Sequence, residues 1–266
     1  MTSSSSSSLK LEMTTPGVAV ITGASSGIGR ATAIALAEAG WTCVLSGRRE
    51  DELKETAKMI EKATEAEGKT LIVSGDLTQP GASEKVFESA FNTFGRIDLL
   101  FNNAGIAQPN GPIDEIDFEA FQKLLHINIS VPFECTSLAF KYMKKQNPQG
   151  GRIINNGSIS SMSPRPNSAP YTLSKHAITG LTKSTALDGR QYRIACTQID
   201  IGNAISSLSA SIGTGHPQAD GSIKKEDMMD VRYAAQSVVY LASLPLEVNV
   251  LNQTIMATNM PFVGRG

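Results

Sequence analysis

Short apolar stretches alternate along the chain with longer segments in which apolar residues recur every three or four positions. The first stretch, Val18 to Ile21, is rich in β-branched residues, which is typical of a strand buried on both faces. A glycine-rich turn follows, and then a helical segment that ends at Gly40, where glycine is the usual residue after a helix. This part of the chain therefore predicts a strand, a turn and a helix in direct succession.

The same alternation continues along the rest of the chain. Further strands are predicted at 41–46, 69–74, 96–101, 151–155, 192–199 and 253–257, and further helices at 50–67, 81–94, 118–145, 171–187 and 231–243. The helix 118–145 is expected to bend near Pro132. The alternation predicts an α/β fold, a Rossmann-like doubly wound parallel sheet of about seven strands with helices on both faces.

Length and composition place these elements in one domain. The 266 residues suit a single core, and we expect it to span 16–266. The serine run Ser3 to Ser8 lacks the apolar core of a secretory signal and the arginines of a transit peptide, so residues 1–15 predict a disordered tail. The net charge of −1 offers no basic surface for nucleic acid, and no apolar run is long enough to span a membrane.

The cysteines and histidines are few and scattered. Cys43, Cys135 and Cys196 are odd in number and far apart, which predicts reduced thiols of a cytoplasmic protein and no disulfide framework. The three histidines have no metal-ligand spacing, so no metal site is predicted. The candidate chemistry therefore lies in the turns that follow the strands, because ligands of such folds bind beyond the carboxyl ends of the strands.

The first of these turns has the properties of a phosphate site. Glycines allow a tight turn and a close approach of the backbone, and the helix that follows directs unpaired N–H groups and its positive dipole end at an anion. A dinucleotide pyrophosphate fits this description, although a plain strand–turn–helix would carry a similar pattern. The residues expected to contact it are Gly23, Ser25, Ser26, Gly27, Ile28 and Gly29.

The end of the second strand indicates which dinucleotide binds. NAD sites of this architecture carry an acidic residue there for the adenosine ribose, whereas this chain has Gly47, Arg48 and Arg49. Arg48 lies nineteen residues after Gly29, and its guanidinium can bind a 2′-phosphate for which Gly47 leaves room. NADP(H) is therefore predicted over NAD(H). The alternative is that Arg48 and Arg49 are solvated residues at a helix start, which fits Arg49 better.

The most specific chemistry lies between the fifth strand and the next helix. Tyr171 and Lys175 are four residues apart, so a helix places them on one face, one turn from each other. An ammonium group favours the phenolate, which makes a tyrosine usable as a general acid and base. Ser158, thirteen residues before Tyr171, offers a hydroxyl to a substrate oxygen. A surface Tyr and Lys at helical spacing is the alternative, which the other motifs argue against.

Taken together, these motifs resemble the short-chain dehydrogenase/reductase family from about Pro16 to the C-terminus. The resemblance implies Tyr171 as the catalytic acid and base, Ser158 as the group that polarises the carbonyl, and Lys175 as the ligand of the nicotinamide ribose. It also implies that Asn128 holds a water of the proton relay, the alternative being a polar residue bonded to nearby backbone. The other cofactor contacts that it implies are Asp76, Leu77, Asn103, Ala104, Gly105, Gly202, Ala204 and Ser206, together with Tyr171 and Lys175.

Two of these positions have a specific alternative or a departure from the family pattern. Asp76 can accept a hydrogen bond from the adenine amino group, or form an Asx turn or helix cap before Pro80. After the sixth strand the family usually has Pro-Gly, and this chain has Ile201-Gly202. We expect that turn to seat the nicotinamide nevertheless.

The predicted function is an NADP(H)-dependent oxidoreductase of the carbonyl reductase type, acting on a ketone or secondary alcohol. The alternatives are an NAD-linked sugar or polyol dehydrogenase, and a catalytically silent nucleotide-sensing or scaffold protein. A lid at about 205–228 is expected over the substrate. The resemblance implies a homo-oligomer, a tetramer or dimer, that uses the helices 118–145 and 171–187 and the apolar residues near the C-terminus.

Overall fold

The computed structural model describes residues 14–66, 68–205 and 215–263. They form a seven-stranded parallel sheet in the order β3-β2-β1-β4-β5-β6-β9, which confirms the predicted fold class. The strands are β1 Val18–Thr22, β2 Thr42–Gly47, β3 Thr70–Ser74, β4 Leu99–Asn102, β5 Gly151–Asn156, β6 Ile194–Ile201 and β9 Asn252–Ile255. The order reverses between β1 and β4, and ligands of such sheets bind at that point, beyond the carboxyl ends of the strands.

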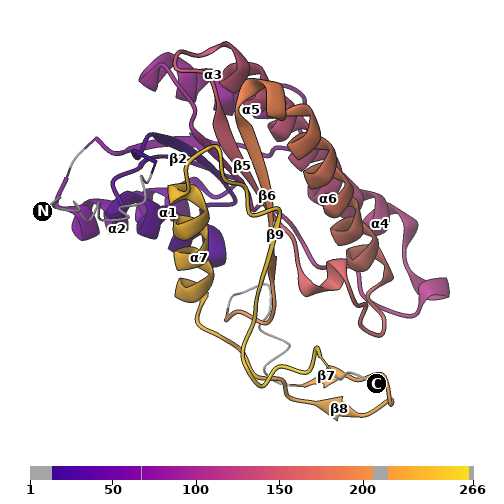
Figure 1. The fold of residues 1–266 in the computed structure, drawn as a ribbon. Coiled ribbons are helices and arrows are strands. Elements are labelled where there is room, and N and C mark those ends of the chain that lie inside the picture. The colour runs from indigo at the N-terminus through magenta and orange to yellow at the C-terminus, as the bar shows by residue number, and fades with distance from the viewer. Residues whose placement is uncertain (1–13, 67, 206–214, 264–266) are drawn as a thin grey trace, which may run out of the picture.

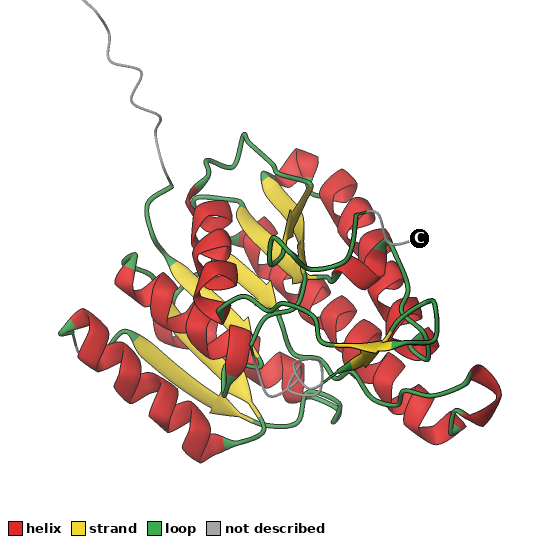
Figure 2. Cartoon of the chain, turned by 90° about the horizontal axis from the view of Figure 1, so that it is seen from below, coloured by secondary structure: helices red, strands yellow, loops and turns green. Residues whose placement is uncertain are grey.

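Helices cover both faces of the sheet, as Figure 1 shows, and the strands lie side by side between them in Figure 2. The helices are α1 Gly27–Glu38, α2 Glu50–Thr64, α3 Ala82–Phe94, α4 Phe118–Leu125, α5 Val131–Lys145, α6 Ala169–Asp188 and α7 Val231–Ser243. Helices α1, α2 and α7 form one layer, and α3, α5, α6 and α4 form the other.

The alternation of side chains along each strand supplies two apolar cores. Ala19 and Ile21 of β1 face the core beneath α1, α2 and α7, whereas Val18 and Val20 face the core beneath α3 and α5. Both sets are buried because successive strand residues point to opposite faces of the sheet. The run Val18 to Ile21 is apolar throughout because its side chains enter both cores.

Three segments differ from the sequence predictions. The predicted helix 118–145 is divided by a π-helical turn at His126–Ser130, so the irregular part precedes Pro132. The predicted lid contains two short antiparallel strands, β7 His216–Pro217 and β8 Ile223–Lys224, which extend beyond the main sheet (Figure 1). Thr14 of the predicted tail donates hydrogen bonds to the end of α7, from its backbone N–H to Ser243 O and from its hydroxyl to Leu244 O.

A buried arginine joins β5 to the segment that leads into β9. Arg152 is 2% exposed and donates to the carbonyl oxygens of Leu244, Pro245 and Val248 at 3.2, 3.2 and 2.8 Å. Burial lowers the pKa of this guanidinium to about 10. The carbonyl dipoles replace the water that the buried cation has lost.

Candidate functional site

The glycine turn after β1 has the tight geometry that its sequence predicts. Gly23 and Gly27 have φ angles of +69° and +55°, a region that side-chain-bearing residues rarely adopt. A Cβ atom at Gly29 would collide with the carbonyl oxygen of Gly23 and the amide of Asn103. The close packing of α1 against the turn therefore requires glycine at 29, and it leaves the first N–H groups of α1 directed toward the end of the sheet.

Arg30 of helix α1 links this turn to helix α2 through hydrogen bonds. Arg30 donates from Nη2 to the carbonyl oxygen of Ser25 at 2.6 Å and to Glu52 Oε2 at 2.6 Å, and from Nε to Thr56 Oγ1 at 2.9 Å. These bonds link the turn to α2. The turn is thus held in place by the protein itself.

The two arginines after β2 have different surroundings. Arg49, which sequence reasoning favoured as a solvated residue, donates to Ser25 Oγ at 3.0 Å and to Ser26 Oγ at 2.7 Å. Arg48 is exposed and lines a hollow beside the turn. Arg49 and the hydroxyls of Ser25 and Ser26 therefore lie together at the turn, whereas Arg48 lines the hollow with Asp76 and Thr78. We call Arg48, Arg49, Ser25 and Ser26 the donor set, because such groups are suited to bind a phosphate.

Space for an adenosine lies next to this donor set. A Cβ atom at Gly47 would make only ordinary contacts, at 3.5 Å to Ser25 Oγ and 3.6 Å to Leu53, and one at Gly75 would meet no atom within 4 Å. Packing therefore does not require either glycine, and both leave open room at the ends of β2 and β3. A hollow of about 290 Å³ lies there, lined by Arg48, Asp76, Thr78, Gln122, Lys123, His126 and Ile127. These features fit an adenosine 2′-phosphate.

Asp76 forms the predicted Asx turn and also lines the hollow. Its Oδ1 accepts from the N–H and the hydroxyl of Thr78, at 3.0 and 2.9 Å, which is the Asx turn. The N–H of Thr78 holds the pKa of the Asp76 carboxyl below its ordinary value, with further help from the Thr78 hydroxyl and Arg48. The residue nevertheless lines the hollow. The side chain of Leu77 is buried in the core, so a cofactor contact at this position would use its backbone.

The turn after β4 is joined to the glycine turn. Thr22 Oγ1 accepts from the N–H groups of Asn103 and Ala104 at 2.9 and 3.0 Å, and the Asn103 amide donates to Thr22 O at 3.0 Å. Asn103 therefore ties the ends of β1 and β4 together. Gly105 follows and is exposed.

Helix α6 brings Tyr171 and Lys175 to the same edge of the sheet. Lys175 is largely buried, and its ammonium donates to the carbonyl oxygen of Asn156 at 2.7 Å. Its Nζ lies 5.5 Å from the centroid of the Tyr171 ring. The Asn156 amide in turn donates to Asn103 Oδ1 at 3.0 Å. Hydrogen bonds thus connect Lys175 to the glycine turn through Asn156, a residue that the sequence did not single out.

Ser158 lies two residues beyond Asn156, where β5 gives way to a 3-10 turn at Ile159–Ser161 that packs against α6. Its Oγ accepts from the N–H of Ser160 at 3.1 Å. Because that bond uses a lone pair, the hydroxyl proton is left for an oxygen outside the turn.

Asn128 is 3% exposed and lies within the π-helical turn. Its amide accepts from Ile106 N–H at 2.9 Å and donates to Ile106 O at 2.8 Å and Ser174 Oγ at 3.1 Å. This is the alternative that sequence reasoning gave, a polar side chain bonded to nearby backbone. The side chain thereby joins the loop after β4 to α6, next to Lys175.

The turn after β6 completes the edge. Ile201 pairs in register with Ile255 at the end of the β6–β9 ladder, where a proline would offer no backbone N–H. A Cβ atom at Gly202 would collide with Met256 and Met260, so packing requires that glycine. Ala204 is buried and bridges to Met229. Ser206 lies outside the described residues.

A buried ion pair joins the segment of the predicted lid to the loop that leads from Ser158 into α6. Arg165, in the loop between Ser158 and α6, forms two hydrogen bonds of 2.6 Å with Glu226. Asn203 and Gln218 also donate to Glu226, at 2.8 and 3.0 Å. Burial alone would raise the pKa of the Glu226 carboxyl, but the bonds from Arg165, Gln218 and Asn203 outweigh it and lower the pKa to about 2. We name these four residues the lid clasp.

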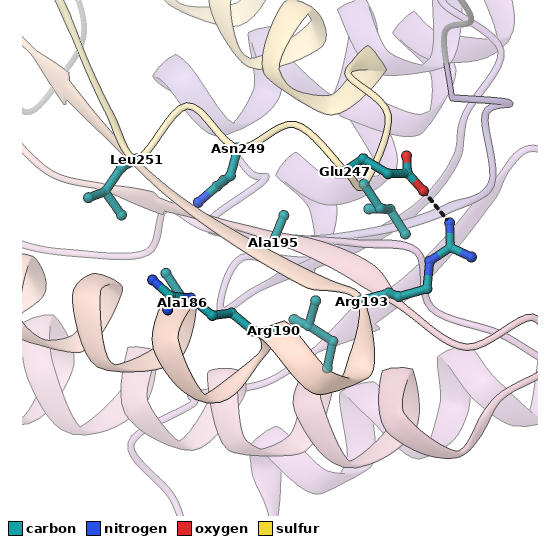
Figure 3. A pocket seen from close by; sticks show the side chains of 9 residues that line it. Ala186, Arg190, Arg193, Ala195, Glu247, Asn249 and Leu251 are labelled. Atoms are coloured by element: carbon teal, nitrogen blue, oxygen red, sulfur yellow. Dashed lines mark hydrogen bonds and ion pairs between the residues drawn. The ribbon is translucent and has the colours of Figure 1, made fainter.

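A second hollow, of about 530 Å³, lies at the opposite, amino-terminal end of β6. Figure 3 shows it between Ala186 and Arg190 on one side and the segment with Glu247 and Leu251 on the other. It contains none of the predicted site residues. Within the described residues, no cluster of His, Cys, Asp and Glu could hold a metal ion, and no helix is long and apolar enough to cross a membrane.

Residues 17–216 match the sequence profile of the family described as short chain dehydrogenase. An uncharacterized oxidoreductase from Thermotoga maritima is 34% identical over 208 residues, which cover 78% of this chain and 80% of that protein. The structure of levodione reductase superposes with a TM-score of 0.81 at 25% identity and covers 91% of this chain and 96% of its own. An alcohol dehydrogenase from the archaeon Thermococcus sibiricus, solved with 5-hydroxy-NADP, has a TM-score of 0.79 at 22% identity, with 92% of this chain and 98% of that one covered.

Proposed function

Because the chain belongs to the short chain dehydrogenase family of oxidoreductases, which act on alcohol and carbonyl groups, we propose that it is an NADP(H)-dependent carbonyl reductase. Its substrate is a ketone or the corresponding secondary alcohol. One observation carries the proposal: the hydrogen-bonded path from Lys175 through Asn156 and Asn103 to the glycine turn. This path joins an acid–base pair to a dinucleotide-binding turn within one rigid edge of the sheet.

The donor set of Arg48, Arg49, Ser25 and Ser26 supports NADP(H) as the cofactor. Guanidinium groups bind a 2′-phosphate in a forked geometry, and a ribose 2′-hydroxyl would instead call for a carboxylate at this position. The archaeal alcohol dehydrogenase of the same fold binds a 5-hydroxy derivative of NADP, so the fold accommodates such a cofactor. When bound, the nicotinamide group supplies or accepts the hydride.

The residues of the chain carry the proton chemistry. The Ser158 hydroxyl donates a hydrogen bond to the carbonyl oxygen and polarises the C=O bond, while the Tyr171 phenol transfers its proton to the same oxygen during reduction. The Lys175 ammonium favours the phenolate that remains. Asn128 has a positioning role, since its side-chain amide forms hydrogen bonds with Ile106 and Ser174.

A kinetic experiment tests this assignment. NADPH oxidation is followed at 340 nm with cyclohexanone, diacetyl, ethyl acetoacetate and fructose, and NADPH binding is measured separately by fluorescence. The parent protein should reduce at least one carbonyl, and Tyr171→Phe should bind NADPH normally but lose on the order of 10³-fold in kcat. Parental turnover by Tyr171→Phe would refute the role of the phenol. NADPH binding without turnover of any carbonyl would favour the silent nucleotide-sensing alternative.

The cofactor preference has its own test. Arg48→Ala and Arg49→Ala should each raise the KM for NADPH by about 10-fold or more and leave the KM for NADH nearly unchanged, because each loses a charge-assisted bond to the phosphate. Arg190→Ala, an exposed arginine beside the hollow at the other end of β6, is the matched control. A variant pair that keeps the parental preference for NADPH would refute the phosphate site, and a parent that prefers NADH would favour the NAD-linked alternative.

We also propose a homo-oligomer. Phe118 of α4, Phe133 of α5 and Leu173 of α6 are 66%, 63% and 56% exposed, and such apolar side chains favour a subunit contact. In the C-terminal segment Met260 is buried beside Asn203, whereas Val263 is 85% exposed. Size-exclusion chromatography with light scattering measures the state directly, and a monomer at micromolar concentration would refute the proposal.

A further inference from the structure

A buried carboxyl group lies directly behind the serine turn. Asp200, in the penultimate position of β6, is 0% exposed. Its Oδ1 accepts from the backbone N–H of Ser158, from Ser161 Oγ and from Gln198 Nε2, each at 2.8 Å. Its Oδ2 accepts from the amide of Asn252 at 2.6 Å. The group is therefore bonded on both oxygens, and its neighbours in these bonds are all neutral donors.

The sheet register brings these groups together. Gln198 and Asp200 are two residues apart on β6, and Asn252 is the register partner of Gln198 on β9, so all three side chains lie on one face of the sheet. Asp200 thus connects three segments: the turn that carries Ser158, strand β6 and the edge strand β9. None of these residues was singled out by the sequence.

The residue before Ser158 is shaped for this contact. A Cβ atom at Gly157 would collide with Asp200 Oδ1 and crowd Gln198. The backbone of Gly157 is fixed in addition by a hydrogen bond of 2.8 Å from its N–H to Ile199 O. The absence of a side chain at Gly157 therefore lets the Asp200 carboxyl oxygen reach the N–H of Ser158.

We propose that Asp200 is a positioning residue for Ser158: its carboxyl oxygen fixes the serine turn through hydrogen bonds, so that the hydroxyl meets the carbonyl oxygen of the substrate. Asp200 does not touch the substrate. The inference rests on the proposed carbonyl reduction for its kinetic consequence, whereas the fixed serine turn is a property of the protein alone. A displaced hydroxyl costs rate, because hydrogen bonds to a reacting oxygen depend steeply on geometry.

Two variants separate hydrogen bonding from charge. Asp200→Ala removes every acceptor and should lower kcat about 10- to 100-fold, with the KM for NADPH within about twofold of the parent. Asp200→Asn keeps Oδ1 for Ser158, and a rotated Asn252 amide can accept from the new NH₂ group, so kcat should recover to within about threefold of the parent. Ser83→Ala, which removes a partly buried hydrogen bond to Glu134 far from this edge, controls for a general loss of stability.

Hydrogen exchange gives a readout without substrate. In mass spectrometry of the intact protein, the peptide that contains Ser158 should exchange about 10-fold faster in Asp200→Ala than in the parent, and at nearly the parental rate in Asp200→Asn. Equal losses of kcat in both Asp200 variants would overturn the proposal in favour of a charge effect. Unchanged kcat in Asp200→Ala, or unchanged exchange, would overturn it as well. If the parent reduces none of the four carbonyls, the proposed function fails, but the exchange result still decides the positioning role.

Discussion

Breaking the lid clasp should cost measurable stability at neutral pH. In Glu226→Gln the new amide places NH₂ against a guanidinium that is only 10% exposed, and Arg165 loses its carboxylate. The lowering of the Glu226 pKa from its ordinary value of 4.5 to about 2 corresponds to about 3 kcal/mol at neutral pH. Removal of one partner of a buried pair has a similar cost, about 3–5 kcal/mol. We therefore expect the free energy of unfolding to fall by about 3 kcal/mol at pH 7.

Urea denaturation provides the assay. Trp41 is the single tryptophan and is buried, so its fluorescence reports unfolding of the domain. Glu247→Gln is the matched control, because Glu247 and its partner Arg193 are 67% and 61% exposed, and such a surface pair contributes less than about 1 kcal/mol. Arg165→Met combined with Glu226→Met should recover part of the loss, since no unpaired charge then remains buried.

The pH dependence adds a second criterion with a definite sign. A depressed carboxyl pKa stabilises the fold above the ordinary pKa of about 4.5, and this contribution is lost as pH falls toward 2. The difference between the parent and Glu226→Gln should therefore shrink to about half at pH 3. A Glu226→Gln variant no less stable than Glu247→Gln at pH 7, or a stability difference that stays constant down to pH 3, would refute the role of the ion pair.

Three further predictions follow from buried groups and from one open glycine. Burial raises the pKa of each cysteine thiol to about 12, so a disulfide-exchange reagent at pH 8 should label none of them in the native protein and all of them in urea; native labelling would contradict their burial. The thiols are Cys43, Cys135 and Cys196. Arg152→Met should destabilise the protein by about 2 kcal/mol in urea denaturation, because three carbonyl groups lose their donor; an unchanged midpoint would show that water replaces it. Gly47→Ala should keep the parental stability but weaken NADPH binding in a fluorescence titration, and parental affinity would argue against the phosphate beside it.

The sequence predicted the fold because the fold depends on local patterns. The buried strand before Gly23, the helical spacing of Tyr171 and Lys175, and the seven-stranded parallel sheet follow from short-range periodicity. The π-helical turn at His126–Ser130 was missed, because the apolar spacing there is that of an α-helix and the bonds from Asn128 to Ile106 are tertiary.

Contacts between distant residues explain the other misses. Arg49 reaches Ser25 across 24 positions, and Asp200 reaches Ser158 across 42. A long or buried polar side chain can satisfy its hydrogen bonds in many ways, and only the folded register selects one of them. The aspartate at 200 was nevertheless a usable signal, since a carboxylate inside an apolar strand needs donors around it.

The Arg152 guanidinium has a consequence for the synthesis of the chain. Its carbonyl acceptors lie 92 to 96 residues further on, and the edge strand β9 follows them directly. Until these residues leave the ribosome, burial of β5 would leave the Arg152 guanidinium without its hydrogen-bond acceptors. Strand β6 would meanwhile present an unpaired edge. The domain therefore cannot complete its sheet before residues 244–255 have been synthesised. In that interval a chaperone that shields strand edges would protect it from aggregation.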